Sequence, residues 1–103
     1  MKREILFRGK SPKGHWIYGM PSYDLKYIFN DSNYDSHDQF EIIPETIGQF
    51  TGLTDKNGVK IFENDKTNMG VVLFENGCFG IESEMNDFIS FELINLNMLY
   101  LLN

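Results

Sequence analysis

Short hydrophobic runs rich in β-branched and aromatic residues alternate with clusters of polar turn residues along this 103-residue chain. Runs of this kind, bounded by Gly, Pro, Asn and Asp, are typical of short β-strands. They predict strands at residues 4–7, 16–20, 26–30, 40–45, 47–53, 59–62, 71–74 and 78–81. The pattern therefore indicates a mainly β fold, a small barrel or sandwich of short antiparallel strands and hairpins.

Two Asn-Gly dipeptides mark hairpin turns in this pattern. Asn57-Gly58 precedes the run at residues 59–62, and Asn76-Gly77 separates the runs at residues 71–74 and 78–81. Asn-Gly readily adopts the positive φ values of hairpin turns, so both sites predict antiparallel pairs. Gly48 and Gly52 are expected to allow a bulge or a close strand approach, and Pro44 is expected to end the strand that precedes it.

The C-terminal segment allows two interpretations. Ile89, Phe91 and Leu93 alternate at the strand period, and apolar residues alternate on the other parity from Ile94 onward. A bulge between Leu93 and Ile94 would join the two halves into one long strand, which is the prediction that we favour. Leucine and methionine enrichment also permits a short C-terminal helix.

Length and composition predict a single domain over residues 1–103 with one hydrophobic core. The one cysteine, Cys78, cannot form an internal disulfide, which favours a reducing cytoplasm. No apolar stretch approaches the length of a membrane span, and no signal sequence is apparent, so we expect a soluble protein without a membrane partner.

The charge is unevenly distributed. The chain carries a net charge of −6, but residues 1–14 carry +4 and the remaining 89 residues carry −10. An acidic chain is a poor match for a phosphate backbone, so we do not expect nucleic acid as a partner. We expect the N-terminal cations to lie on an edge strand, where they block sheet aggregation or pair with the acidic part of the chain.

The motifs that carry known chemistry are absent or incomplete. Residues 47–58 lack the spacing and the following helix of a phosphate-binding loop. Asp31, Asn33 and Asp35 begin like a calcium loop, but Ser36 and Ile42 occupy its two defining positions. His15 and His37 fit no zinc spacing, and Cys78 has no evident catalytic base. We therefore expect no enzyme, no cofactor and no metal.

Aromatic residues supply one candidate binding site. Phe50, Phe62, Phe74 and Phe79 are expected in the core, since few cations accompany them. A site for a small ligand such as a nucleotide would combine stacking rings with hydrogen-bonding side chains near the glycines. Its residues would be Trp16, Tyr18, Gln49, Thr51 and Thr54.

Two stretches carry a resemblance to a known family. The segment "REILFRGKSPKGHWIYG" and above all "IPETIGQFTGLTDKNGVKIFEND" resemble the YopX family of small phage and prophage proteins. Asn64 stands where that family usually has glycine. The resemblance implies a β-rich domain in a bacterial host cell, self-association, no established enzymatic activity and no catalytic residues to carry over.

These observations predict a non-enzymatic phage or prophage accessory protein in the bacterial cytoplasm. It would act by self-assembly as a homo-oligomer or by binding an unidentified protein. Two alternatives stay open: a nucleotide-like ligand at the site above, and an acidic surface that mimics nucleic acid.

Overall fold

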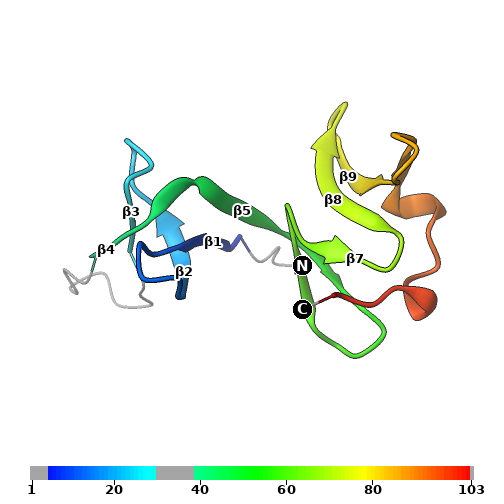
Figure 1. Ribbon diagram of the computed structural model, residues 1–103, viewed down its shortest axis with the longest axis horizontal. Coiled ribbons are helices and arrows are strands. Elements are labelled where there is room, and N and C mark those ends of the chain that lie inside the picture. Colours follow the sequence, from blue (N-terminus) through cyan, green and yellow to red (C-terminus); the bar gives the residue numbers. More distant parts are fainter. Residues whose placement is uncertain (1–4, 30–38, 103) are drawn as a thin grey trace. The chain divides into compact units, whose positions relative to one another are not determined.

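The computed structural model describes residues 5–29 and 39–102, which form short strands and two 3-10 helices (Figure 1). The strands are β1 (Phe7–Lys10), β2 (Trp16–Pro21), β3 (Tyr27–Phe29), β4 (Gln39–Glu41), β5 (Ile43–Thr54), β6 (Lys60–Phe62), β7 (Lys66–Thr67), β8 (Gly70–Glu75), β9 (Cys78–Glu82) and β10 (Phe88–Ser90). The 3-10 helices are η1 (Phe91–Leu93) and η2 (Leu96–Met98).

The strands form two antiparallel sheets. One has the order β4-β3-β2-β1-β5-β6 and the other the order β10-β9-β8-β7. Neither sheet closes into a barrel within the described residues. The predicted mainly β fold of short antiparallel strands is confirmed, as two open sheets.

The chain divides into two compact units, unit 1 (Met1–Gln49) and unit 2 (Phe50–Asn103). β5 contributes to both, because its first half pairs with β1 and its second half pairs with β6. The single domain over residues 1–103 stays a prediction.

Unit 1 has a small apolar core on one face of its sheet. Ile28 on β3 and Ile42, between β4 and β5, are almost fully buried. Gly9 lies against both, since a Cβ at this position would come within 3.0 Å of Ile42 and 3.2 Å of Ile28. At Gly9, β1 therefore contributes backbone rather than a side chain to this core.

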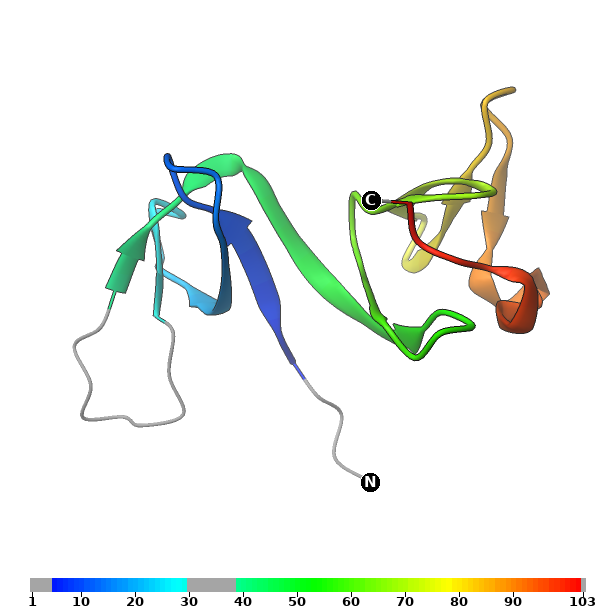
Figure 2. The ribbon, with the colours of Figure 1, turned by 60° about the horizontal axis from the view of Figure 1, so that its bottom comes forward.

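Unit 2 has the larger core, formed where β6, the four-stranded sheet and the C-terminal tail meet (Figure 2). Its buried members are Ile61, Val72, Ile81, Phe91 and Leu99. They come from β6, β8, β9, η1 and the residue after η2. The tail is thus part of the core and not an appendage.

The hairpin between β5 and β6 confirms the bulge predicted at Gly52 and the turn predicted at Asn57-Gly58. The register shifts between Phe50 and Thr54, and Gly52 in this bulge has φ +88°. Thr51 spans the bulge, because its hydroxyl donates to the Ile61 carbonyl (2.9 Å) and accepts from the Leu53 amide (3.2 Å). Gly58 has φ +80° in the turn, where glycine is free of a Cβ clash.

Asp55 joins this hairpin to the C-terminal tail. One oxygen of its buried carboxylate accepts from the amides of Asn57 (2.8 Å) and Val59 (2.9 Å), and the other accepts from the amide of Leu101 (3.1 Å). Asn68, between β7 and β8, also binds the tail, because its side chain donates to the Met98 carbonyl and accepts from the Tyr100 amide. Polar side chains of this region therefore complete backbone hydrogen bonds.

The strand before Pro44 does end, as predicted, but two residues earlier than the proline: β4 ends at Glu41, and Pro44 is the second residue of β5. The pairing with β1 is irregular here, with Arg8 opposite Gly48 and Lys10 opposite Ile43. The amide of Lys10 donates to the Thr46 hydroxyl (2.7 Å) at this irregularity. A proline is tolerated where the ladder is interrupted in this way.

The predicted long C-terminal strand is wrong. β10 ends at Ser90, whose hydroxyl accepts from the Glu92 amide and caps η1. Asn95 caps η2 in the same way through the Asn97 amide (3.0 Å). Local side-chain caps compete with strand pairing, so the tail forms two single 3-10 turns, closer to the alternative of a short helix.

Strand β1 lies three residues later than predicted, and its neighbours place it inside the sheet. It pairs with β2 on one side and with β5 on the other, so the expected edge strand for Arg8 and Lys10 is wrong. The turn at residues 11–15 sets the register, because the Ser11 amide donates to the His15 carbonyl (2.8 Å).

Asn64 stands where the YopX family usually has glycine, and it adopts a backbone conformation that favours glycine. Its φ is +75°, in the left-handed region that asparagine tolerates better than other residues with a side chain. We expect Asn64→Val to lower the free energy of unfolding by roughly 1–2 kcal/mol, while Asn64→Gly changes it little. Urea denaturation of the two variants tests this, and equal stabilities would contradict it.

Candidate functional site

Strand β2 presents a row of large side chains to solvent. Exposed and half-buried residues alternate along it, and the exposed ones are Trp16 (39%), Tyr18 (42%) and Met20 (50%). In the adjacent β1, Lys10 lies opposite Trp16 and Arg8 lies opposite Tyr18. Directly paired residues of antiparallel strands share a face, so aromatic and cationic side chains stand together here.

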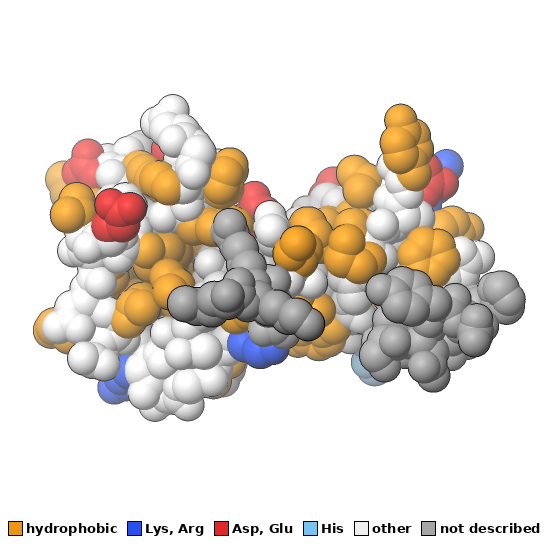
Figure 3. Space-filling view, turned by 180° about the vertical axis from the view of Figure 1, so that it is seen from behind, with side chains coloured by type: hydrophobic (Ala, Val, Ile, Leu, Met, Phe, Trp, Pro, Cys, Tyr) orange, Lys and Arg blue, Asp and Glu red, His pale blue; other side chains and the backbone are white. Residues whose placement is uncertain are grey.

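Strand β3 extends this surface. Phe29 pairs with Met20 and is 42% exposed. We call the six residues of this surface the aromatic face: Arg8, Lys10, Trp16, Tyr18, Met20 and Phe29. Figure 3 shows that hydrophobic side chains reach the surface in both units.

Two cations hold the Trp16 ring. The Arg8 guanidinium carbon lies 3.9 Å from the ring centroid, and the Lys10 ammonium lies 5.1 Å from it. Each such contact contributes about 0.5–1 kcal/mol at a partly exposed site. The ring is thereby held in one orientation on the surface of the sheet.

The ligand site expected from the sequence is distributed over both units. Trp16 and Tyr18 lie together on the aromatic face of unit 1, and Gln49 is half-buried opposite Phe7. Thr51 and Thr54 belong to unit 2. Thr51 is buried with its hydroxyl engaged across the bulge, and Thr54 is exposed opposite Lys60. The five-residue ligand site stays a prediction.

The remaining aromatic predictions are mostly confirmed. Phe50 and Phe62 are buried, with ring centroids 5.5 Å apart. Phe79 is half-buried and packs edge-on against Phe74 at 4.9 Å. The core position expected for Phe74 is wrong, because this residue is 51% exposed on β8.

The candidate reactive groups are not members of the aromatic face. Cys78 is half-buried, and its thiol donates to the Glu75 carbonyl (3.5 Å). His15 is exposed in the β1–β2 turn. The calcium-like loop from Asp31, together with His37, lies outside the described residues except at its end. Among the described residues, no three His, Cys, Asp or Glu side chains are grouped to hold a metal.

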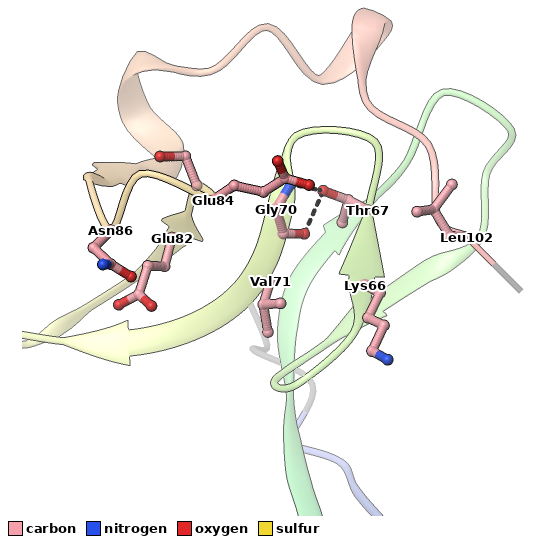
Figure 4. Close-up of a pocket in the computed structure, with 9 residues that line it drawn as sticks. Lys66, Thr67, Gly70, Val71, Glu82, Glu84, Asn86 and Leu102 are labelled. Carbon is pink, nitrogen blue, oxygen red and sulfur yellow. Dashed lines mark hydrogen bonds between the residues drawn. The ribbon is translucent and has the colours of Figure 1, made fainter.

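Unit 2 contains a pocket of about 360 Å³ beside the β7–β8 turn (Figure 4). Figure 4 shows the side chain of Glu84 reaching toward Thr67 and Gly70. The Thr67 hydroxyl donates to the Gly70 carbonyl (2.8 Å) and accepts from the amides of Met69 and Gly70. The buried polar side chain of this pocket is therefore engaged within its own turn.

Sequence reasoning identified two of the six residues in the aromatic face. Met20 could have been added, because it continues the alternation of Trp16 and Tyr18. Phe29, Arg8 and Lys10 could not have been identified from the sequence, because their positions on this face depend on which strands flank β2.

No helix in the described part of the chain has the length and apolar character needed to cross a membrane. No curated protein and no solved structure matches the chain. A sequence model of the family described as YopX protein matches residues 6–98. Because this match spans most of the sequence and includes the motif at residues 44–65, the chain belongs to the YopX family.

Proposed function

We propose that this protein is a non-enzymatic phage or prophage accessory protein that binds a protein partner through the aromatic face. It works in the cytoplasm of the bacterial host. The observation that carries the proposal is the group of large side chains exposed together on β2 and β3. The family resemblance supports the phage lineage, and the lone cysteine supports a reducing compartment.

The composition of the aromatic face favours a protein partner. Tryptophan, tyrosine, methionine and arginine are enriched at protein interfaces, and tryptophan, tyrosine and arginine dominate their energetic hot spots. Contiguous apolar patches on soluble proteins commonly mark interaction sites. The cations at Arg8 and Lys10 favour a partner that carries carboxylates beside its apolar contact.

The two alternatives receive less support. A nucleotide could stack on Trp16, but Thr51 already uses its hydroxyl within the hairpin. Unit 2 has three lysines and eight acidic residues, a net charge of −5, which suits nucleic-acid mimicry. That role would leave the aromatic face unexplained.

Co-purification from bacteria that carry the phage tests the proposal. The tagged full chain is compared with the double variant Trp16→Ala/Tyr18→Ala. We expect the variant to lose its bound protein, because truncating one hot-spot residue costs about 2 kcal/mol or more, roughly 30-fold in affinity.

Tyr23→Ala is the matched control. Tyr23 is fully exposed in the β2–β3 turn and lies outside the aromatic face. This variant should retain the partner. Retention of the same protein by the Trp16/Tyr18 variant would contradict the proposal.

A further inference from the structure

The β9–β10 turn of unit 2 carries features complementary to the aromatic face. Met85 at this turn is 83% exposed, and the exposed carboxylates of Glu84 and Asp87 flank it. An isolated methionine between two acids is the counterpart of aromatic rings beside two cations. Methionine sulfur makes favourable contacts with aromatic rings, and its flexible side chain adapts to them.

The turn is held in one conformation before any contact. The Ser83 amide donates to the Asp87 carbonyl (2.9 Å), and the Ser83 carbonyl accepts from the Asn86 amide (2.9 Å). The Ser83 hydroxyl also accepts from the Met85 and Asp87 amides (3.3 and 3.4 Å). Little backbone entropy is therefore lost when Met85 is buried.

From this complementarity we infer that the β9–β10 turn of one copy docks on the aromatic face of a second copy. Met85 packs against Trp16 and Tyr18, and the carboxylates of Glu84 and Asp87 approach the cations of Arg8 and Lys10. The inference rests on the proposed function and names the partner of the same face.

The charge distribution supports a second copy as the occupant. Unit 2 carries a net charge of −5, whereas unit 1 carries −1 and places two cations on the aromatic face. Two aromatic faces would bring like charges together, while a face and an acidic turn bring opposite charges together. The same chain therefore supplies both halves of a complementary pair.

The contact is heterologous, because different surfaces of the two copies meet. Each copy keeps one unused face and one unused turn, so the assembly grows head to tail unless its rotation closes a ring. One hairpin turn on one sheet face buries less than the roughly 1,200–2,000 Å² of stable complexes. The association is therefore weak, and it rises with concentration and falls with added salt.

Sedimentation of the full chain and two complementary variants tests the inference. The face variant is Lys10→Glu/Met20→Glu, and the turn variant is Glu84→Lys/Met85→Ala. The average mass of the unaltered chain should rise above the 12.0 kDa of one copy as its concentration increases. Each variant alone should have an association constant at least about tenfold lower than that of the unaltered chain, since each lacks one half of the contact.

The decisive sample is an equimolar mixture of the two variants. The intact turn of one and the intact face of the other should form a species of two chains and nothing larger. The control Glu92→Lys/Leu93→Ala alters another exposed acid and its apolar neighbour in unit 2 and should associate like the unaltered chain. Circular dichroism confirms that each variant is folded.

A monomeric unaltered chain at all concentrations would overturn the inference. Normal association of the turn variant would also overturn it and would indicate contact between two aromatic faces. A mixture of the two variants that stays monomeric would overturn it as well. In those cases, if Trp16→Ala/Tyr18→Ala loses a bound protein in the co-purification, the proposed function is still supported, and the aromatic face binds a protein other than a second copy of this chain. If that variant keeps its partner, the proposed function fails.

Discussion

Asp55→Ala will destabilise unit 2 by roughly 3 kcal/mol or more, because three backbone amides lose a charged, buried acceptor. These amides belong to Asn57, Val59 and Leu101. Whole proteins have a free energy of unfolding of only about 5–15 kcal/mol, so this change is a large fraction of the stability of a unit of this size. The loss of these three charge-assisted hydrogen bonds accounts for most of the change.

Asp55→Asn separates the hydrogen bonds that Asp55 makes within the hairpin from the hydrogen bond that it makes to the tail. The amide oxygen can still accept from Asn57 and Val59, but its NH₂ group then faces the Leu101 amide, which is also a donor. We expect an intermediate loss of stability, concentrated where the tail meets the hairpin. Asp87→Asn, an exposed carboxylate of the same unit, should change the stability by less than about 0.5 kcal/mol.

Amide hydrogen exchange is the appropriate measurement. The one tryptophan, Trp16, lies in unit 1, so its fluorescence does not report directly on unit 2. In Asp55→Ala the amides of Val59 and Leu101 should lose protection first. Unchanged protection of both would contradict the role assigned to Asp55.

The same carboxylate makes the stability of unit 2 depend on pH. Burial raises the pKa of Asp55, but hydrogen bonds from the amides of Val59, Leu101 and Asn57, with the charge of Lys56, outweigh it and hold the pKa below its ordinary value of 3.8. Its contribution is therefore complete above the unfolded value and is lost as the pH falls through the lower native pKa. The stability difference between the unaltered chain and Asp55→Asn should shrink across this range, and a constant difference would contradict it.

Leu99→Ala will also destabilise unit 2, by about 2–5 kcal/mol, because it leaves a cavity in the core. Leu99 has no exposed surface and packs with Ile61, Val72, Ile81 and Phe91. Its carbonyl also accepts from the Lys56 amide (2.9 Å), so the tail is fixed at both backbone and side chain. Loss of the side chain should loosen the whole tail.

Leu93→Ala is the matched control for this change. Leu93 lies in the same tail but is 80% exposed, so its truncation should alter stability by less than about 0.5 kcal/mol. Urea denaturation followed by the NMR signals of unit 2 measures both variants. Equal losses in the two would show that the tail is not packed as described.

Local chemistry made several elements predictable. Asn57-Gly58 and Asn76-Gly77 identified two hairpins, and Gly52 identified a bulge, because positive φ angles restrict which residues can occupy such positions. The C-terminal tail was predicted poorly. Its apolar residues fit a strand, but the caps at Ser90 and Asn95 and the burial of Phe91 and Leu99 produced two 3-10 turns.

The candidate site was only partly predictable for the same reason. Trp16 and Tyr18 stood out because they are large aromatic residues two apart in a strand. Their neighbours Arg8 and Lys10 were assigned to an edge strand, and the pairing of β1 with β5 overturned this. The composition of the aromatic face is thus a property of strand order, which no local pattern contains.

By itself, the sequence determined the mainly β class, the turns, the bulge and the family, since each depends on residues that are neighbours along the chain. Only the tertiary structure decided that Arg8 and Lys10 flank Trp16, and that Asp55 binds the amide of Leu101, 46 residues away. The physical reason is that these contacts require distant segments to pair, and the energy that selects one pairing comes from the packed core and completed hydrogen bonds of the whole unit.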